Sequence, residues 1–294
     1  MLALLVKPTL WESRRAKAVL EVLQTSGAAV LQGSNSVELS IELAALQVIY
    51  PDLTLVACGG DGTFHLALNS LPDLQIPIAV LPMGTGNDLA RYLGIKKLKL
   101  GIAALRNGAP VKMDMGTIES SDGSTRRFAG IASCGFDAQV NERANTYRGP
   151  AGTLKYLVAL AVELIKLNSR EFVVSTDGGG KITGRFTLIA VGNTSSYGGG
   201  LKMCPTANAF DQSFEVTYVD HVTRRLLVRV LPKIFWGGHT KHRQVTQNAV
   251  QKIQIGGDEF PVYADGEKVG HGPVVITLHP GAMRVWQAQP TNTP

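Results

Sequence analysis

The apolar run Leu53–Ala57 leads directly into the glycine-rich segment Cys58-Gly59-Gly60-Asp61-Gly62-Thr63, and a helical pattern follows through His65–Leu68. A strand that ends in such a turn and continues as a helix is where a doubly wound sheet binds ligands. Glycines lack Cβ, so the backbone approaches a phosphate chain closely, and the amides at the helix start face the anion. The segment therefore predicts a phosphate-binding turn.

Asp61 is the unusual residue of this turn, because a carboxylate does not itself favour a phosphate. It makes sense beside phosphates if it holds Mg²⁺, directly or through water, or if it takes a proton. The alternative is a purely structural turn in which Asp61 caps the helix.

A second turn of the same kind, Pro82-Met83-Gly84-Thr85-Gly86-Asn87-Asp88, follows the apolar strand Ile78–Leu81 and precedes another helix. Two such turns on consecutive strand ends place two phosphate-compatible loops and two carboxylates on one edge of the sheet. Asn87 or Asp88 serving only as a helix cap is the alternative. The GxxxxGK[ST] pattern is absent, which argues against a P-loop enzyme. After the first strand, Lys7-Pro8-Thr9-Leu10 stands in the place of a GxGxxG fingerprint, which argues against a nicotinamide dehydrogenase.

The hydrophobic pattern changes character near Val111, which divides the chain into two predicted domains. Before it, strands alternate with helices such as 11–24 and 37–50, as in a parallel sheet covered on both faces. After it, short strands separated by turn residues predominate, with helices at 154–166 and 223–235. Strands are expected at 112–118, 127–133, 172–176, 185–191, 214–219, 250–255, 261–264, 274–278 and 284–286. We predict a doubly wound α/β nucleotide-binding domain at 1–115, to which the tail 281–294 returns, and a β-sandwich domain at 116–280.

The composition of the chain indicates which partners and which cellular setting to expect. The chain has 294 residues, 45% hydrophobic residues and a net charge of +6, which suits a folded protein with an anionic partner. Its three cysteines have no CxxC spacing, so a reducing, cytoplasmic setting is expected. No apolar stretch reaches the roughly 20 residues that span a bilayer. Basic residues interleaved with base-stacking aromatics are absent, so no nucleic acid partner is expected.

Together, these segments resemble the diacylglycerol kinase catalytic-domain family, which includes bacterial lipid kinases and the sphingosine and ceramide kinases. The resemblance runs along nearly the whole chain. Its residues are Gly59-Gly60-Asp61-Gly62-Thr63, Pro82–Asp88, Val111–Gly116, Gly192-Asn193, Tyr197–Gly200, Gly238–His242 and Asp265-Gly266-Glu267.

The resemblance implies ATP and Mg²⁺ as cofactors and assigns roles to the motif residues. Gly59–His65 and Thr85 would line the ATP site, together with Gly84, Gly86 and Asn87, and Gly33-Ser34-Asn35 would add a contact. Asp61, Asp88 and Asp114 would organise the magnesium ion. Glu267, with Asp265 close by, would accept the proton of the substrate hydroxyl. Without the resemblance, Asp265-Gly266 reads as an ordinary hairpin turn.

Two departures from the family pattern concern the nucleotide and a second metal site. Lys7–Leu10 replaces an Asn-Pro segment containing Ser and Gly. The family's structural magnesium site uses acidic residues after a proline, and here Asp211 is kept while Thr206 stands where an acid is often found. A second site at Asp211 is therefore expected to be weak.

The stretch His221–Trp236 predicts a basic amphipathic helix. Arg225, Arg229 and Lys233 recur every four residues against an apolar set that includes Leu227 and Ile234. Such a helix suits anionic lipid headgroups at a membrane surface, and the alternative is a helix with a solvated basic face.

The resemblance and the residues together favour an ATP- and Mg²⁺-dependent lipid kinase. We expect it to convert diacylglycerol to phosphatidic acid while attached peripherally to a membrane, with a homodimer as an alternative to the monomer. The rival hypotheses are a kinase of a soluble substrate such as NAD, and a catalytically silent nucleotide- or lipid-binding protein.

Overall fold

Unit 1, which comprises Met1–Met113 and Gly281–Pro294, is built on a parallel sheet. The computed structural model describes residues 1–6, 17, 21, 23, 25, 27–146 and 153–288, so the Lys7–Leu10 loop and most of the helix expected at 11–24 lie outside the described residues. Strands follow in the order β13-β4-β3-β1-β2, and every neighbouring pair is parallel. Their bounds are β1 (Leu2–Val6), β2 (Ala29–Val30), β3 (Thr54–Gly59), β4 (Ile78–Pro82) and β13 (Glu267–Trp286), of which only the end of β13 belongs here.

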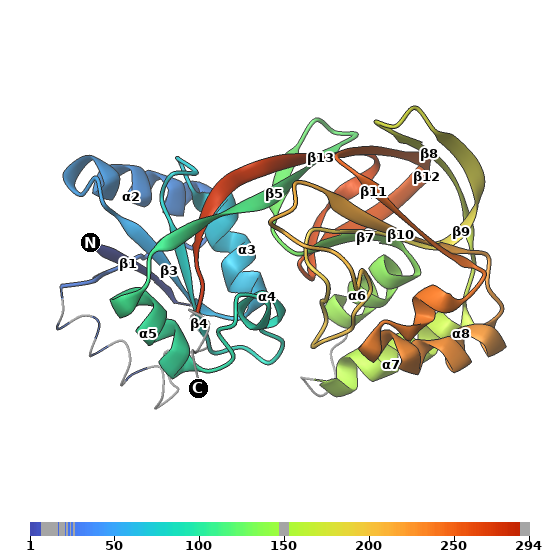
Figure 1. The fold of residues 1–294 in the computed structure, drawn as a ribbon, viewed down its shortest axis with the longest axis horizontal. Helices are drawn as coiled ribbons and strands as arrows, with labels where there is room; N and C mark the ends of the chain where they lie inside the picture. Colours follow the sequence, from blue (N-terminus) through green and yellow to red (C-terminus); the bar gives the residue numbers. More distant parts are fainter. Residues whose placement is uncertain are drawn as a thin grey trace. The chain divides into compact units, whose positions relative to one another are not determined.

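Helices cover both faces of this sheet, because alternate strand residues point to opposite sides. Leu4, Val56 and Leu81 pack with α5 (Leu98–Asn107) through one apolar cluster. Helices α2 (Ser36–Ile49) and α3 (Asp61–Ser70) lie on the opposite side of the strands (Figure 1). The short helix α4 (Asp88–Tyr92) follows β4. The doubly wound α/β architecture predicted from the sequence is confirmed.

Unit 2, Asp114–Pro280, is a β-rich domain whose paired strands are antiparallel. Its apolar core includes Phe128, Phe172, Phe214 and Phe260, each at most 1% exposed. The strands are β5 (Pro110–Ser120), β6 (Thr125–Phe128), β7 (Ile131–Gly135), β8 (Arg170–Thr176), β9 (Lys181–Gly192), β10 (Phe214–Asp220), β11 (Val245–Val250), β12 (Lys252–Ala264) and most of β13. The predicted β-sandwich class is confirmed.

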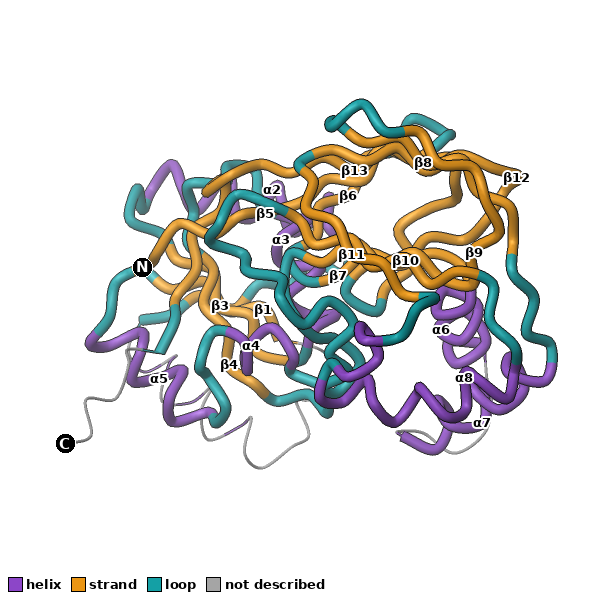
Figure 2. Tube along the Cα trace, turned by 45° about the vertical axis from the view of Figure 1, so that its right-hand side comes forward, coloured by secondary structure: helices purple, strands orange, loops and turns teal. Residues whose placement is uncertain are grey.

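The helices of unit 2 gather on one side of β9 and β10 (Figure 2). They are α6 (Phe136–Thr146), α7 (Thr153–Ile165), α8 (Arg224–Val230) and the 3₁₀ turns η2 (Leu231–Trp236) and η3 (Gly238–Lys241). Sequence patterning missed α6, because only Phe136, Val140 and Ala144 of this polar segment reach the apolar cluster. The stretch expected as one helix at 223–235 is an α-helix that tightens into a 3₁₀ helix, with Pro232 in its first turn.

Five predicted strands differ in extent from those of the structure. The strand expected at 127–133 is interrupted at Ala129 and Gly130, whose amides donate to the Asp265 carboxylate instead of a neighbouring strand. The segments 250–255 and 261–264 fall largely within the single strand β12, which has a register shift between Ile255 and Phe260. The segments 274–278 and 284–286 both belong to β13, which runs unbroken from Glu267 to Trp286.

Gly116 offers a direct test of the packing between β5 and β6. A Cβ at Gly116 would lie 2.1 Å from Phe128 Cε1, and the Phe128 ring stacks on Phe214 with centroids 5.6 Å apart. We predict that Gly116→Ala destabilises unit 2 by about 1–3 kcal/mol, because the core must shift to admit the methyl group. Thermal unfolding measures the effect, and a melting midpoint within error of wild type would contradict it.

Gly184→Ala is the matched control for this substitution. Gly184 also lies in a strand of unit 2, but a Cβ there meets Phe186 at an ordinary 3.5 Å. We expect its unfolding midpoint to stay close to that of the unmodified protein.

Candidate functional site

The two glycine-rich turns of unit 1 press directly against each other. Strands β3 and β4 pair so that Gly59 lies opposite Pro82, and the Met83 amide donates to the Gly59 carbonyl at 2.9 Å. A Cβ on Gly84 would lie only 2.6 Å from the Cα of Gly60. Gly84 therefore requires glycine, since a side chain there would push the turns apart, whereas a Cβ on Gly60 would make a tight contact of 3.2 Å with the Gly84 Cα.

Asn87 closes the second turn with its side chain. Its backbone is left-handed, with φ 55°, a conformation that Asn tolerates better than most residues. Its Oδ1 accepts from the Gly84 amide at 3.0 Å, and its Nδ2 donates to the Gly84 carbonyl at 2.6 Å. The Asn87 side chain makes no capping bond to α4, so its role is to shape the turn.

Asp61 joins the first turn to the helix that follows the second. Its Oδ1 accepts from the Leu89 amide at 3.1 Å, which satisfies one of the unpaired N–H groups at the start of α4. Asp61 is the first residue of α3, whose own N-cap is Gly60. Its structural contribution is thus to bridge the turns rather than to cap α3.

The carboxylates of Asp61 and Asp88 converge on Gly86. A Cβ at Gly86 would lie 2.7 Å from Asp61 Oδ2 and 3.6 Å from Asp88 Oδ2. Asp88 is 5% exposed, and its Oδ1 accepts from Arg91 Nη1 at 2.7 Å. One oxygen of each carboxylate therefore lies beside Gly86, which has no side chain of its own.

Thr63 places a buried hydroxyl at the same turn. It is 5% exposed, and its Oγ1 lies so close to Gly59 that a Cβ there would be 2.1 Å away. Within the described residues this Oγ1 has no hydrogen-bond partner. Thr63 is therefore packed tightly against the bare backbone of Gly59, and its buried hydroxyl is left unsatisfied at some cost in stability.

The Gly33-Ser34-Asn35 segment, expected to add a nucleotide contact, forms the start of α2. Asn35 Oδ1 accepts from the amides of Val37 and Glu38 at 3.0 Å each. Ser34 donates its amide and its hydroxyl to the Glu38 carboxylate at 2.8 and 2.9 Å. These hydrogen bonds lower the pKa of Glu38. The donors of this segment are therefore used within the chain.

In unit 2, Asp265 and Gly266 form the two-residue turn between β12 and β13. Both have positive φ, 54° and 82°, as tight hairpins require. The Asp265 carboxylate accepts from the Gly130 amide at 2.8 Å and from the Ala129 amide at 3.1 Å. Glu267 pairs with Ala264 across the hairpin and is exposed. Asp265 thus anchors the hairpin from which Glu267 projects.

Asn193 and Asp114 meet the same Ala129–Gly130 turn. Asn193 is fully buried, and its Nδ2 donates to the carbonyls of Asp114 and Ala129 at 2.8 and 2.7 Å. Asp114 is 3% exposed, and its Oδ2 accepts from the Gln212 amide at 2.7 Å. The sequence motifs at 114, 193 and 265 are therefore parts of one hydrogen-bonded network within unit 2.

Asp211 lies beside a carboxyl group that sequence reasoning missed. Glu215 on β10 is 8% exposed, and burial raises its pKa to about 7 while the charge of Asp211 adds to the increase. Asp211 Oδ1 accepts from the Ser213 amide at 3.1 Å. The available signal was an acidic residue inside the apolar strand Phe214–Val219. In the described part of the chain, no three His, Cys, Asp or Glu side chains form a metal-binding group.

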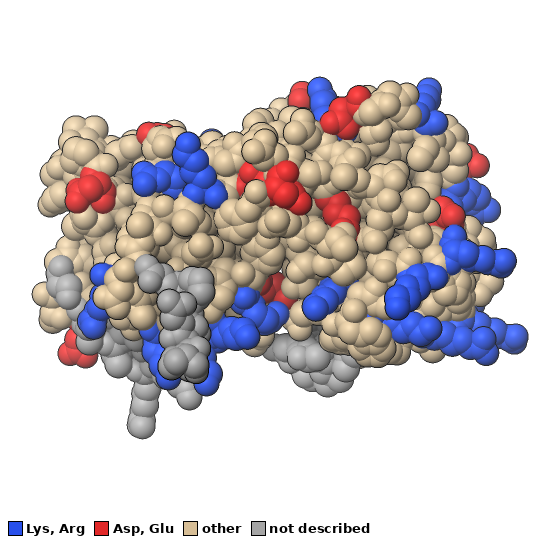
Figure 3. All heavy atoms as spheres, viewed as in Figure 1, with Lys and Arg blue, Asp and Glu red and all other residues tan. Residues whose placement is uncertain are grey.

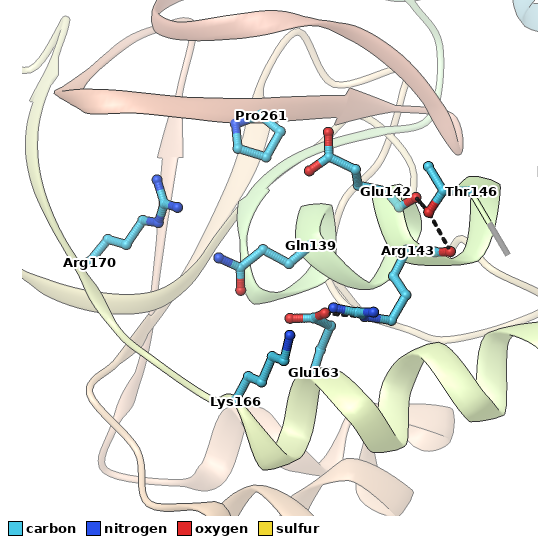
Figure 4. A pocket seen from close by; sticks show the side chains of 8 residues that line it. All are labelled: Gln139, Glu142, Arg143, Thr146, Glu163, Lys166, Arg170 and Pro261. Carbon is cyan, nitrogen blue, oxygen red and sulfur yellow. Dashed lines mark hydrogen bonds and ion pairs between the residues drawn. The ribbon is translucent and has the colours of Figure 1, made fainter.

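A charged pocket of about 340 Å³ opens between α6, α7 and the strands β8 and β12 (Figure 4). Arg143 is paired with Glu163 inside it, and Glu142 at its rim is paired with Lys268. None of the site residues predicted from the sequence lines this pocket. We therefore assign it no part in the predicted chemistry.

Sequence comparisons place these features in a known family. The family model described as the diacylglycerol kinase catalytic domain matches residues 12–118, and that of the YegS C-terminal NAD kinase beta sandwich-like domain matches residues 130–287. A diacylglycerol kinase of Mycobacterium tuberculosis is 36% identical over 83% of this chain and 79% of its own length. A diacylglycerol kinase of Staphylococcus aureus is 27% identical over 74% of this chain and 69% of its own.

Solved structures share the fold at low sequence identity. A crystal structure of a diacylglycerol kinase from Bacillus anthracis has a TM-score of 0.71 at 17% identity, covering 97% of this chain and 96% of that one. An NAD kinase from Archaeoglobus fulgidus in complex with ATP has a TM-score of 0.55 at 14% identity, covering 98% of this chain and 94% of that one.

No helix among the described residues is both long and apolar enough to cross a bilayer. The matched family models and the relative from M. tuberculosis show that the chain belongs to the diacylglycerol kinase catalytic-domain family and is a lipid kinase.

Proposed function

We propose that this lipid kinase transfers the γ-phosphoryl group of ATP to the free hydroxyl of diacylglycerol, with Mg²⁺, and releases phosphatidic acid and ADP. The observation that carries the proposal is the pair of interlocked glycine turns, on which two carboxylates converge at Gly86. This arrangement lies at the carboxyl ends of adjacent parallel strands, where α/β sheets bind nucleotides.

The phosphates of ATP lie, in this proposal, along Gly59–Thr63 and Gly84–Asn87. The absence of side chains at Gly60 and Gly84 lets backbone amides face the phosphate oxygens at close range. The start of α3 adds the favourable end of its dipole. Thr85 is exposed at the tip of the second turn, available to the nucleotide.

The donor set at Gly86 fits a magnesium ion that is held chiefly by its substrate. Magnesium commonly keeps one or two protein carboxylates and completes its shell with phosphates and water, which agrees with the two aspartates beside Gly86. Asp61 and Asp88 would hold the ion, and we propose Asp114 as a contributor through water. When bound, the ion neutralises charge on the transferring phosphoryl group. Asp211 stays a proposed ligand of a second, weaker site.

Glu267 is the proposed proton acceptor. As the acceptor hydroxyl oxygen bonds to the γ-phosphorus, the bond to the β,γ-bridging oxygen breaks, ADP leaves, and the hydroxyl proton passes to the Glu267 carboxylate. The geometry favours Glu267 over Asp265, because both Asp265 oxygens already accept backbone amides whereas the Glu267 side chain is exposed. We therefore assign Asp265 a positioning role.

The acceptor is tested with radiolabelled ATP and a panel of lipids, with NAD as the soluble alternative. We expect label to be transferred to diacylglycerol, in agreement with the names of the relatives, and to depend on Mg²⁺. Transfer to NAD alone would overturn the proposal and favour the activity named for the structural neighbour from A. fulgidus. Transfer to no acceptor, with ATP still bound, would favour a catalytically silent protein.

Substitutions at the hairpin separate the two carboxylates. We predict that Glu267→Gln lowers turnover about 10²- to 10⁴-fold without lowering the unfolding midpoint, because it removes only the base. Asp265→Asn would set an NH₂ group against a backbone amide, costing about 1–3 kcal/mol and lowering the midpoint. Initial rates and thermal unfolding of both variants are the measurements.

Glu119→Gln serves as the control, since Glu119 is an exposed glutamate on β5 in the same unit. It should keep both the rate and the midpoint of the unmodified enzyme. Lipid phosphorylation by Glu267→Gln at the rate of this control would remove Glu267 as the base.

A further inference from the structure

The positive charge of the chain is concentrated in one stretch that has no acidic residue. Residues 221–257 hold seven of the 29 Lys and Arg and none of the 23 Asp and Glu. The rest of the chain, with 22 Lys and Arg against 23 acids, is nearly neutral. Figure 3 shows basic side chains gathered over the part of unit 2 where α8 lies. The excess of positive charge therefore comes from this stretch of sequence, and four of its seven cations lie on α8 and η2.

The helical part of this stretch has a buried side that fixes it to unit 2. Leu227 of α8 is 9% exposed and packs in a cluster with Phe136 and Val140 of α6. Ile234 of η2 is 6% exposed and packs with Met203 and Cys204. The segment is thus held in place by its own core contacts, and its outward side chains have a fixed platform.

The outward side carries large apolar side chains among the cations. Val228, Phe235 and Trp236 are 53%, 57% and 66% exposed. Arg225, Arg229 and Lys233 are exposed on the same two elements. We call the surface formed by these six residues the α8–η2 surface. A merely solvated basic face does not require two exposed aromatic rings beside its charges.

Trp236 is set at the end of this surface by two glycines. Gly237, with φ 75°, ends η2, and a Cβ on Gly238 would lie 2.8 Å from Trp236 Nε1. The Nε1 side of the indole ring therefore lies beside the bare backbone of Gly238, while the Trp236 side chain as a whole is largely exposed. Indole rings with an apolar body and a polar edge favour the headgroup level of membranes.

We propose that the α8–η2 surface docks this enzyme onto anionic lipid bilayers, with Phe235 and Trp236 inserted among the headgroups and the three cations facing lipid phosphates. The inference rests on the proposed function in that the acceptor is a membrane lipid. Amphipathic segments with basic and aromatic residues bind in this way, and each basic residue near an anionic surface strengthens binding about fivefold. The attraction falls as salt screens the charges.

Vesicle flotation tests the docking directly. We compare phosphatidylcholine vesicles with and without phosphatidylglycerol, at low and high salt. The variant Arg225→Gln/Arg229→Gln/Lys233→Gln should lose affinity for anionic vesicles on the order of 100-fold. The control Lys96→Gln/Lys97→Gln/Lys99→Gln removes the same charge from exposed positions of unit 1 and should bind like the unmodified enzyme. Equal loss in the two variants would overturn the proposal.

Trp236 provides an independent readout of insertion. Brominated lipids should quench part of the tryptophan emission of the unmodified enzyme, and Trp236→Phe should abolish that quenching although Trp11 and Trp286 remain. Unchanged quenching in Trp236→Phe contradicts insertion at this surface. Two results would show that this surface binds something other than a bilayer. One is a change of molecular mass in the triple glutamine variant, and the other is tighter binding to a single-stranded oligonucleotide than to vesicles.

Activity assays separate failure of docking from failure of the proposed function. The triple glutamine variant should phosphorylate a short-chain diacylglycerol dispersed in water at the normal rate, but long-chain diacylglycerol in anionic vesicles at least tenfold more slowly. Equal rates on vesicles would overturn the docking and leave the proposed function standing. If the unmodified enzyme phosphorylates neither lipid yet floats with anionic vesicles, the docking stands and the proposed function falls.

Discussion

The close approach of Gly60 and Gly84 is the constraint on which the nucleotide half of this protein depends. A Cβ on Gly84 would come within 2.6 Å of the Gly60 backbone, so the two turns leave no room for a side chain at position 84. This contact sets the starting points of α3 and α4, and the bond from the Leu89 amide to Asp61 then fixes α4 to the first turn. The oxygens of Asp61 and Asp88 both lie beside Gly86 in the resulting arrangement.

In unit 2 the motif residues are held together by hydrogen bonds, whereas in unit 1 the two turns are held together by close backbone contact. The Ala129–Gly130 turn leaves the strand ladder, and both its amides donate to Asp265 while Asn193 binds the Ala129 carbonyl. The Nδ2 of Asn193 and the carboxylate of Asp265 thus link motif residues that lie far apart in the sequence, although the Asn193 Oδ1 has no partner among the described residues. Asp265 anchors the hairpin, and the Glu267 side chain is left exposed.

Local chemistry made much of this predictable. The glycine turns, the parallel sheet and the strand-rich second half follow from patterns within a few residues. Features that depend on contacts between residues far apart in the sequence could not be predicted from these local patterns. The split of the 127–133 strand depends on Asp265, which lies more than 130 residues later in the sequence. The different surroundings of Asp265 and Glu267 depend on hydrogen bonds from Ala129 and Gly130, which the sequence spacing of the two acids does not reveal. Helix α6 was missed because few of its side chains are apolar, and Glu215 because an acid in a strand usually faces solvent.

The ATP affinity of glycine variants reports on whether the contact between the two turns shapes a phosphate-binding site. Calorimetric titration of the unmodified enzyme, Gly60→Ala and Gly84→Ala with ATP and Mg²⁺ compares intact turns with turns forced apart, while circular dichroism verifies that each variant is folded. Gly178→Ala, where a Cβ meets nothing closer than 3.8 Å, is the control. We expect Gly84→Ala to bind ATP at least about tenfold more weakly, because a loss of about 1.4 kcal/mol of phosphate contact is enough for that change. Binding by the control should be unchanged. Wild-type affinity in both folded turn variants would contradict it.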